Sequence, residues 1–318
     1  MTAAADILTI TLNPALDIST GVDAVRPDEK LRCDAPLLDP GGGGINVARA
    51  IRLSGGSATA FVALAGFRGQ QLAALLKAEG VPMIPFSLNG ETRMSLAVSD
   101  RQDGTQFRFV MPGPAWSDTT LAALCDQLSQ VIAANTHVVL SGSHPPGVPD
   151  DFPKMLAGIT RAKGAVLTLD TSGAALSVQT TRDGAMADIL RLDNAESETL
   201  AGRALSNLAD VATFAQSIVS DGHARAVVLA LGAKGSVLAT ADQILHAATP
   251  PVPVVSKVGA GDSFVGAFTL SRAKGDDWSE ALRHGTAAAS AAVMSPATDL
   301  CRPDDLRSLL PQVKITKL

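Results

Sequence analysis

Aromatic residues are scarce in this 318-residue sequence: they make up 3% of it, and tyrosine is absent. Hydrophobic residues nevertheless reach 46%, which is enough for a sizeable core. Alanine, valine, leucine and glycine must therefore do most of the packing. Side chains of this kind suit a parallel sheet that helices cover on both faces.

Other shortages exclude whole classes of protein. With a net charge of −5, the chain lacks the basic excess that a nucleic-acid binder needs to meet phosphates. No apolar run approaches the roughly 20 residues that cross a bilayer. No basic segment precedes an apolar stretch in residues 1–6, so no signal peptide is expected. We therefore expect a cytoplasmic protein whose partners include neither nucleic acid nor membrane.

Cysteine and histidine are also rare and dispersed. Cys33, Cys125 and Cys301 form no CxxC pair, and with three cysteines at least one must stay without a disulfide partner. Reduced thiols are therefore the simple interpretation. None of the five histidines has the spacing of metal ligands, and a dedicated zinc site is not expected.

Apolar runs and helical patterns alternate over most of the chain. Strands are predicted at residues 7–12, 57–66, 137–143, 165–170, 187–192 and 225–232, and helices at 45–53, 70–80, 117–134, 150–163, 206–220, 259–273 and 279–294. A further helix is expected just before residue 187. This alternation indicates βαβ units around a parallel sheet, so the predicted fold class is α/β, with one domain over residues 1–318.

Two polar segments depart from this pattern and predict a small β lid. Residues 17–38 contain two short strand-like pieces joined through residues 26–29, which favours a hairpin. Residues 93–110 contain two more around Asp103-Gly104, a dipeptide that favours hairpin turns. A few strands standing apart from a core are marginally stable and expose an apolar face, so we expect two lids to pair in a homodimer.

The motif that points most directly to chemistry is VGAGDSF at residues 258–264. Its glycines lead into a helical pattern near Asp262, and the free N–H groups of such a helix N-terminus attract phosphate. An acidic residue there suits a base that takes a proton from an attacking hydroxyl. Taken alone, the motif is equally compatible with a helix capped by aspartate after a tight glycine turn.

A second glycine-rich motif, GGGGINVAR at 41–49, also leads into a predicted helix. Its glycines let the backbone approach a ligand closely, and Asn46 offers a donor and an acceptor to sugar hydroxyls. A dinucleotide fingerprint does not fit, because Asn46 takes the third-glycine position and no acidic residue follows about 20 positions later. A Walker P-loop is excluded because Gly-Lys is absent from the chain.

Two more motifs follow predicted strands. Asp17, in NPALD at 13–17, can accept two vicinal hydroxyls, although a turn role fits the sequence equally well. SGSHPPG at 141–147 lies at the carboxyl end of an internal strand, where α/β sheets bind ligands. The lone His144 in it is interpreted as loop structure.

Together these motifs resemble the PfkB (ribokinase-like) carbohydrate kinases over nearly the whole chain. Both signatures of that family are matched, the first by PGGGGINVARAI and the second by LDTSGAAL with VGAGDSFVGA. KLRC at 30–33, RFVMPG at 108–113 and SGSHPPG resemble its phosphosugar kinases, most of all the minor ribokinase-type 6-phosphofructokinases. The resemblance implies a Rossmann-like, mostly parallel central sheet between helices, and a β lid that closes over the sugar.

The resemblance also implies roles for the matched residues. Asp262 would be the catalytic base, and the amides of Gly259, Ala260, Gly261 and Asp262 would form an anion hole for the transferring phosphoryl group. The sugar would be held by Asp17, Gly42, Gly43 and Asn46, and its existing phosphate by Arg93 and Ser143, together with Lys30 and Arg32 of the lid, which could reach it from the partner subunit.

ATP and Mg²⁺ are the implied cofactors, and a monovalent cation is a further candidate. The nucleotide cleft would be lined by Gly232 and Asp193, with Gly259 and Gly261. Asp170 and Glu196 would act on Mg²⁺ indirectly.

Two positions depart from the family pattern. The usual Lys-Pro-Asn-x-x-Glu is replaced by Arg191-Leu192-Asp193-Asn194-Ala195-Glu196, in which Asp193 stands for asparagine. An alignment that puts Asn194 there loses the spacing of the glutamate. Ala230 stands where a serine often precedes Leu-Gly. These changes concern nucleotide contacts and metal handling rather than the class of reaction.

The implied reaction is transfer of the γ-phosphate of ATP to the 1-hydroxyl of fructose 6-phosphate. 1-Phosphofructokinase and tagatose-6-phosphate kinase share every motif above and remain alternatives. A sugar-phosphate-binding regulator without catalysis is an alternative of another class, against which the intact Asp262 and its preceding glycines argue.

Overall fold

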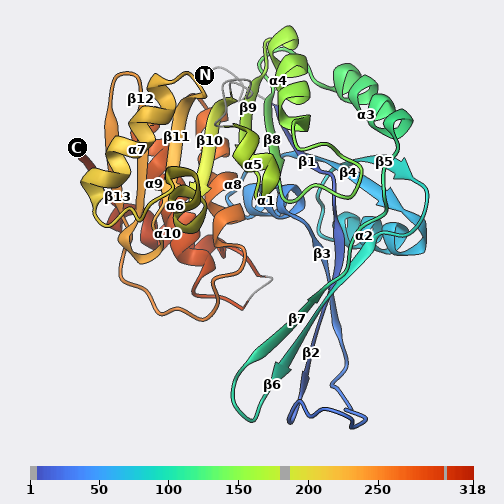
Figure 1. Cartoon of the computed structure of the whole chain (residues 1–318). Helices are drawn as coiled ribbons and strands as arrows, with labels where there is room; N and C mark the ends of the chain where they lie inside the picture. The colour runs from blue at the N-terminus through green and yellow to red at the C-terminus, as the bar shows by residue number, and fades with distance from the viewer. Residues whose placement is uncertain (1–5, 180–186, 297–298) are drawn as a thin grey trace.

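The structure, a computed structural model, describes residues 6–179, 187–296 and 299–318. Its main body is a ten-stranded sheet between two layers of helices, and a separate four-stranded sheet projects from it (Figure 1). The strands of the main sheet are β1 (Ile7–Thr11), β4 (Thr59–Ala65), β5 (Met83–Leu88), β8 (His137–Ser141), β9 (Val166–Asp170), β10 (Ala187–Asp193), β11 (Ala224–Ala230), β12 (Ser236–Thr240), β13 (Ile244–Ala248) and β14 (Lys314–Lys317). Their order is β14-β13-β12-β11-β10-β9-β8-β1-β4-β5.

The strands from β11 to β5 in this order run parallel, and β12, β13 and β14 are added antiparallel at one edge. One face is covered by α1 (Gly43–Leu53), α2 (Gly66–Ala78), α8 (Ala260–Ala273), α9 (Trp278–Ala292) and α10 (Pro303–Leu309). The other is covered by α3 (Asp118–Val131), α4 (Phe152–Lys163), α5 (Ala174–Gln179), α6 (Asn194–Ala201) and α7 (Leu208–Ser220). Successive residues of a central strand enter opposite cores, as Val139 and Leu140 of β8 do, which explains the continuous apolar runs of the sequence.

The predicted α/β fold with a mostly parallel sheet is confirmed. The sequence analysis predicts neither β5 nor the antiparallel edge strands β12, β13 and β14. β12 and β13 follow β11 without an intervening helix, which breaks the βαβ rhythm, and β5 and β14 are short strands of mixed polar and apolar residues. Of the region expected to be helical before residue 187, the structure describes α5, and residues 180–186 lie outside the described residues. In the described part of the chain, no helix is both long and apolar enough to span a membrane.

The small sheet is the predicted lid. Its strands are β2 (Ala15–Val22), β3 (Leu37–Gly41), β6 (Arg93–Asp100) and β7 (Gln106–Val110), in the order β3-β2-β6-β7. The hairpin at 93–110 forms as expected, with Gly104 at a φ of 73° in the turn. No hydrogen-bonded ladder joins the lid to the main sheet among the described residues.

The hairpin predicted within residues 17–38 is only half right. The first strand is β2, but the return strand β3 begins at Leu37, so residues 23–36 form a long loop rather than a tight turn. This loop is polar and largely exposed, and it is fastened to the other hairpin by Arg101, whose Nη2 and Nη1 lie 2.7 Å from Asp23 and 2.5 Å from Asp34. Ion pairs from outside the segment, which local pattern cannot reveal, therefore stabilise the loop.

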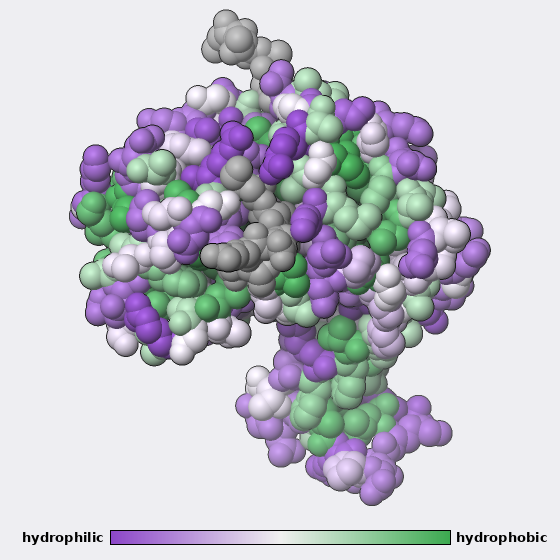
Figure 2. Space-filling model, turned by 45° about the horizontal axis from the view of Figure 1, so that its top comes forward, coloured by the Kyte–Doolittle hydropathy of each residue, from purple (hydrophilic) through white to green (hydrophobic). Residues whose placement is uncertain are grey.

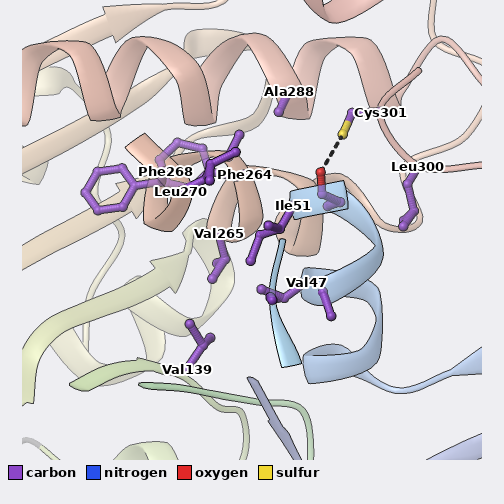
Figure 3. Packing of buried hydrophobic residues seen from close by; sticks show 14 of the residues in the cluster. Val47, Ile51, Val139, Phe264, Val265, Phe268, Leu270, Ala288, Leu300 and Cys301 are labelled. Carbon is purple, nitrogen blue, oxygen red and sulfur yellow. Dashed lines mark hydrogen bonds between the residues drawn. The ribbon is translucent and has the colours of Figure 1, made fainter. Parts of the chain in front are cut away.

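Helices α1 and α8 pack unusually closely under the sheet. A methyl group added at Gly266 of α8 would lie 2.8 Å from the Cβ of Ala50 and 2.9 Å from the carbonyl oxygen of Val47, both in α1. Figure 3 shows the core around this contact, where α1 and α8 meet below α9. Buried Cys301 also lies here, with its Sγ 3.9 Å from the carbonyl oxygen of Ala50.

Replacing Gly266 with alanine is expected to lower the free energy of unfolding by about 1–3 kcal/mol, because the added methyl group has no room against the α1 backbone. The measurement is chemical denaturation of the variant and the wild type.

Gly158→Ala in α4 is the matched control, since a methyl group there meets nothing within 4 Å. Alanine should raise stability at this position by about 0.5–1 kcal/mol. Equal behaviour of the two variants would mean that α1 moves away from α8 at little cost.

Candidate active site

The site lies where the carboxyl ends of the central strands meet the first turns of α1 and α8. Open α/β sheets place ligands at this edge, because loops and helix N-termini converge there. The two glycine-rich motifs of the sequence, more than 200 residues apart, meet at this point. Asn46 of α1 donates from Nδ2 to Oδ2 of Asp262 in α8, at 3.0 Å.

The first turn of α8 carries amides that donate to no side chain of the described residues. Gly259 precedes the helix in the left-handed region at a φ of 76°, and no side chain caps it. In the described part of the chain, the N–H groups of Ala260, Gly261 and Asp262 therefore point out of the helix end without a side-chain acceptor, as an anion site requires. This geometry favours the anion-hole interpretation over an aspartate cap.

The hydrogen bond from Asn46 orients a carboxyl group with an altered pKa. Burial, followed by the nearby charge of Asp170, raises the pKa of Asp262 to about 7, and the Asn46 bond and the cations Arg191 and Arg49 limit the rise. A carboxyl that titrates near neutral pH can accept a proton from a hydroxyl and give it up again. Arg49 is itself fixed by Glu79, with 2.6 Å between Nε and Oε2.

Three polar residues form a row at the ends of β8, β9 and β10. Ser141 lies beside Asp170 in the parallel register, and the same register continued to β10 puts Asp170 beside Arg191. Ser141 Oγ donates to Asp170 Oδ2 at 3.1 Å, and Arg191 Nη1 donates to Oδ1 at 3.1 Å. Both carboxylate oxygens of Asp170 are thus engaged by the protein.

Asp193 and Glu196 are engaged as well, in a capping box at the start of α6. Asp193 Oδ1 accepts from the Glu196 N–H, and Glu196 Oε2 accepts from the Asp193 N–H, each at 2.8 Å. Burial raises the pKa of Glu196. Within residues 6–179, 187–296 and 299–318, no cluster of three acidic, histidine or cysteine side chains could hold a metal by itself.

The carboxylates of Asp170, Asp193 and Glu196 already bond to the protein. They fit a Mg²⁺ ion that is held by nucleotide phosphates and water, and that the carboxylates reach through water. They do not fit a cage built by protein side chains. The indirect role expected for Asp170 and Glu196 stays a prediction.

A cavity of about 570 Å³ opens beside the lid. Arg93 and Ser143, expected to bind the sugar's phosphate, both line it. Arg93 donates from Nε and Nη2 to the carbonyl oxygen of Asn13, at 3.1 and 3.0 Å, and Asn13 Nδ2 donates to Ser143 Oγ at 3.2 Å. Asn13 therefore ties the two together, although its role was not singled out from the sequence.

The glycines of the α1 motif permit close contacts that a side chain would block. Gly42 caps α1 at a φ of 127°, and a methyl group at Gly43 would collide with Ser141 and the amide of Gly142. One at Gly41 would collide with the carboxylate of Asp17. Burial raises the pKa of Asp17 to about 6, and Arg93 and Arg108 oppose that rise.

The remaining expected residues lie farther out. Lys30 and Arg32 are exposed in the loop between β2 and β3 and do not line the cavity as described. Gly232 begins a short 3₁₀ turn, Gly232–Lys234, at a φ of 59°, and its carbonyl oxygen accepts from Thr249 Oγ1 at 3.2 Å. It is exposed, and a methyl group there would meet nothing within 4 Å, so its role in lining the nucleotide cleft stays a prediction.

The chain is similar in sequence to two curated 6-phosphofructokinases. The chain is 39% identical to the ATP-dependent 6-phosphofructokinase isozyme 2 of Mycobacterium tuberculosis, over 94% of this chain and 87% of that protein. It is also 39% identical to the isozyme 2 enzyme of Escherichia coli, over 95% and 97% of the two chains.

Crystal structures of phosphofructokinase-2 from Escherichia coli match this fold. The structure in complex with fructose-6-phosphate has a TM-score of 0.89 and the one in complex with potassium 0.90, each at 38% identity over 97% of this chain and 99% of theirs. The pattern that defines the pfkB family carbohydrate kinases matches residues 8–305. This chain belongs to the pfkB family of carbohydrate kinases.

Proposed function

We propose that this protein is an ATP-dependent 6-phosphofructokinase, which transfers the γ-phosphoryl group of ATP to the 1-hydroxyl of fructose 6-phosphate. The observation that carries the proposal is the Asp262 carboxyl, which titrates near neutral pH and is oriented by Asn46 at an uncapped, glycine-lined helix N-terminus. The identity of 39% to two 6-phosphofructokinases supports the choice of substrate.

In the proposed mechanism, Asp262 accepts the proton of the 1-hydroxyl as that oxygen attacks the γ-phosphorus. The new P–O bond forms while the bond to the β-phosphate oxygen breaks, and ADP leaves with that electron pair. The amides at the start of α8 stabilise the charge on the transferring group, which is where preorganised donors act most strongly. Mg²⁺, when bound, neutralises charge on the nucleotide phosphates; a monovalent cation is a further proposed cofactor.

The sugar is proposed to lie between Asp262 and the cavity of Arg93 and Ser143. Asp17 and Asn46 meet its hydroxyl groups, and the cavity receives the phosphate that the substrate already carries. Arginine suits this role because its planar fork donates two hydrogen bonds to a phosphate. Lys30 and Arg32 are proposed to contribute from a partner subunit, since neither reaches the cavity within its own chain.

Replacing Asp262 with asparagine should lower kcat by about 10²–10⁴-fold or more, while the affinities for sugar and ATP stay near normal. The wild type should lose kcat/KM as pH falls through about 7, because Asp262 must be deprotonated to act and its pKa is raised to that value. Steady-state kinetics across pH 5–9 measures both.

The control is Asp221→Asn, an exposed aspartate that follows α7. It should match the wild type in rate and pH profile. A variant at Asp262 that keeps turnover within tenfold of normal removes it from the role of base.

Replacing Arg93 with alanine should raise the KM for fructose 6-phosphate tenfold or more, since a hydrogen bond to a charged group is worth about 1.5–3 kcal/mol. Turnover of unphosphorylated fructose should change little, because the lost contact does not exist there. A coupled ADP-release assay with fructose 6-phosphate, fructose 1-phosphate, tagatose 6-phosphate and fructose makes the comparison.

An equal loss of kcat/KM on fructose and on fructose 6-phosphate would contradict the assignment of Arg93 to the phosphate subsite. A preference for fructose 1-phosphate or tagatose 6-phosphate would select one of the related kinases instead. Sugar binding without turnover of any of the four would identify a regulator.

We further propose that the protein forms a homodimer through the lid. Side chains alternate between the faces of the lid sheet, and its register puts Ile18, Leu38, Leu96, Val98, Phe107 and Phe109 on one face. Asp17 and Arg108 lie on the other, toward the sugar. Phe107 and Phe109 are 40% and 51% exposed, and Figure 2 shows apolar side chains gathered on the lid below the body. A second lid placed on this face would remove these side chains from water.

The double variant Phe107→Ser/Phe109→Ser should weaken the dimer at least a hundredfold, because burying each phenylalanine contributes about 1.5–3 kcal/mol. Sedimentation equilibrium at micromolar concentration measures the effect, with Gln106→Ser on the opposite face as the control. A wild-type chain that is monomeric at this concentration and still turns over would contradict the proposal.

A further inference from the structure

Arg49 is a charged side chain of α1 to which the proposed mechanism gives no role. It lies three residues after Asn46, so the two side chains are neighbours on one face of the helix. Arg49 Nη1 donates to Asn46 Oδ1 at 3.5 Å, and Asn46 Nδ2 donates to Asp262 Oδ2 at 3.0 Å. The amide of Asn46 therefore links this cation to the proposed base.

Arg49 is held in place by a carboxylate from another helix. Its Nε lies 2.6 Å from Oε2 of Glu79, the residue that caps the C-terminus of α2, and its side chain is only 12% exposed. Hydrogen bonds between charged groups are stronger than those between neutral groups. The pairing with Glu79 therefore limits how far the guanidinium group of Arg49 can turn away from Asn46.

The two partners of the Asn46 amide can each bond in one way only. A guanidinium group carries donors and no acceptor, whereas an ionised carboxylate accepts and does not donate. An amide between them satisfies both only with its oxygen toward Arg49 and its NH₂ group toward Asp262. Turning the amide over would put two acceptors face to face at Asp262 unless that carboxyl group took up a proton. Arg49 thus favours the ionised carboxylate, which is the form that acts as a base.

We propose that Arg49 is a positioning residue that keeps the Asn46 amide turned so that it donates to Asp262. The inference rests on the proposed role of Asp262 as the base, and adds to it the group that maintains the ionised form of this carboxyl. Glu79 holds Arg49 in place for the task. The contacts run from the end of α2 through α1 to the start of α8.

The pH dependence of the reaction reports this role. Burial and the charge of Asp170 on β9 raise the pKa of Asp262, whereas the Asn46 bond, Arg191 on β10 and Arg49 on α1 lower it. Replacing Arg49 with methionine removes a cation and lets the amide turn over, and both changes favour the protonated carboxyl group.

The acidic limb of the kcat/KM profile of Arg49→Met should therefore move upward by about half to one pH unit. At pH 7 this lowers kcat/KM about threefold to tenfold, and by pH 9 the value should recover to within about threefold of the wild type. A merely structural loss would lower kcat/KM at every pH.

Arg52→Met is the matched control. Arg52 is exposed, lies one turn farther along α1 from the site, and borders Gly80, where an added methyl group would lie 3.1 Å from its Nη2. This variant loses the same charge from the same helix and should keep the wild-type profile. The double variant Arg49→Met/Glu79→Gln leaves no unpaired carboxylate to weaken the fold, and it should show the same upward move of the limb as Arg49→Met.

A double-mutant cycle separates the positioning role from the effect of a charge acting directly on Asp262. An Asn46→Ala background has no amide to orient, so Arg49→Met should move the limb there by less than half as much as in the wild-type background. An equal move in both backgrounds, or no move in Arg49→Met, would overturn the proposal.

The same comparison is read without turnover by ¹³C NMR titration of protein with labelled aspartate carboxyl groups. The Asp262 signal is assigned by its loss in Asp262→Asn. Its titration midpoint should rise in Arg49→Met and stay unchanged in Arg52→Met. An absence of phosphotransfer in the wild type would count against the proposed function, while this titration would still decide the role of Arg49.

Discussion

The contact between α1 and α8 at Gly266 is the constraint on which the site depends. Asn46 and Asp262 are 216 positions apart, and a hydrogen bond of 3.0 Å between them requires the two helix backbones to pack without side chains in between. Gly266 and Ala50 provide that approach, and Gly44 lets the other side of α1 lie against β1. The chemistry of Asp262 is thus set by how closely two helices pack one turn deeper in the core.

A second constraint comes from the sheet. Parallel strands in register deliver one residue each to the same edge, so Ser141, Asp170 and Arg191 form a row without any loop to position them. The row places a charge pair in a region that burial would otherwise make costly for either ion alone. Within this row, the charge of Asp170 raises the pKa of Asp262 and the charge of Arg191 lowers it. The pKa of Asp262 is therefore a property of the strand register as well as of its own burial.

Much of the fold and the centre of the site follow from local sequence. Glycine-rich turns before helices, the βαβ rhythm and the Asp103-Gly104 turn are short-range signals, and each leads to an element that the structure contains. Contacts made by tertiary packing were not predictable in the same way. The late start of β3, the role of Asn13 and the pairing of Arg191 with Asp170 depend on residues from distant strands. The sequence places Arg191 in a motif that departs from the family pattern. Only the pairing of β9 with β10 shows that its side chain contacts Asp170.

The scarcity of aromatic residues has a consequence for observing this protein. With no tyrosine, its ultraviolet emission comes from two indole rings. Trp116 lies behind the sugar cavity, where its backbone N–H donates to Pro146 at 2.8 Å, and stacks on Phe86. Trp278 lies 6.3 Å from Phe268 of α8, with Arg272 3.9 Å above its ring. Trp116 thus lies beside the sugar cavity, whereas Trp278 lies at the far end of α8 from the site, so the two native fluorophores are placed to report sugar binding and an unchanged reference without an added dye.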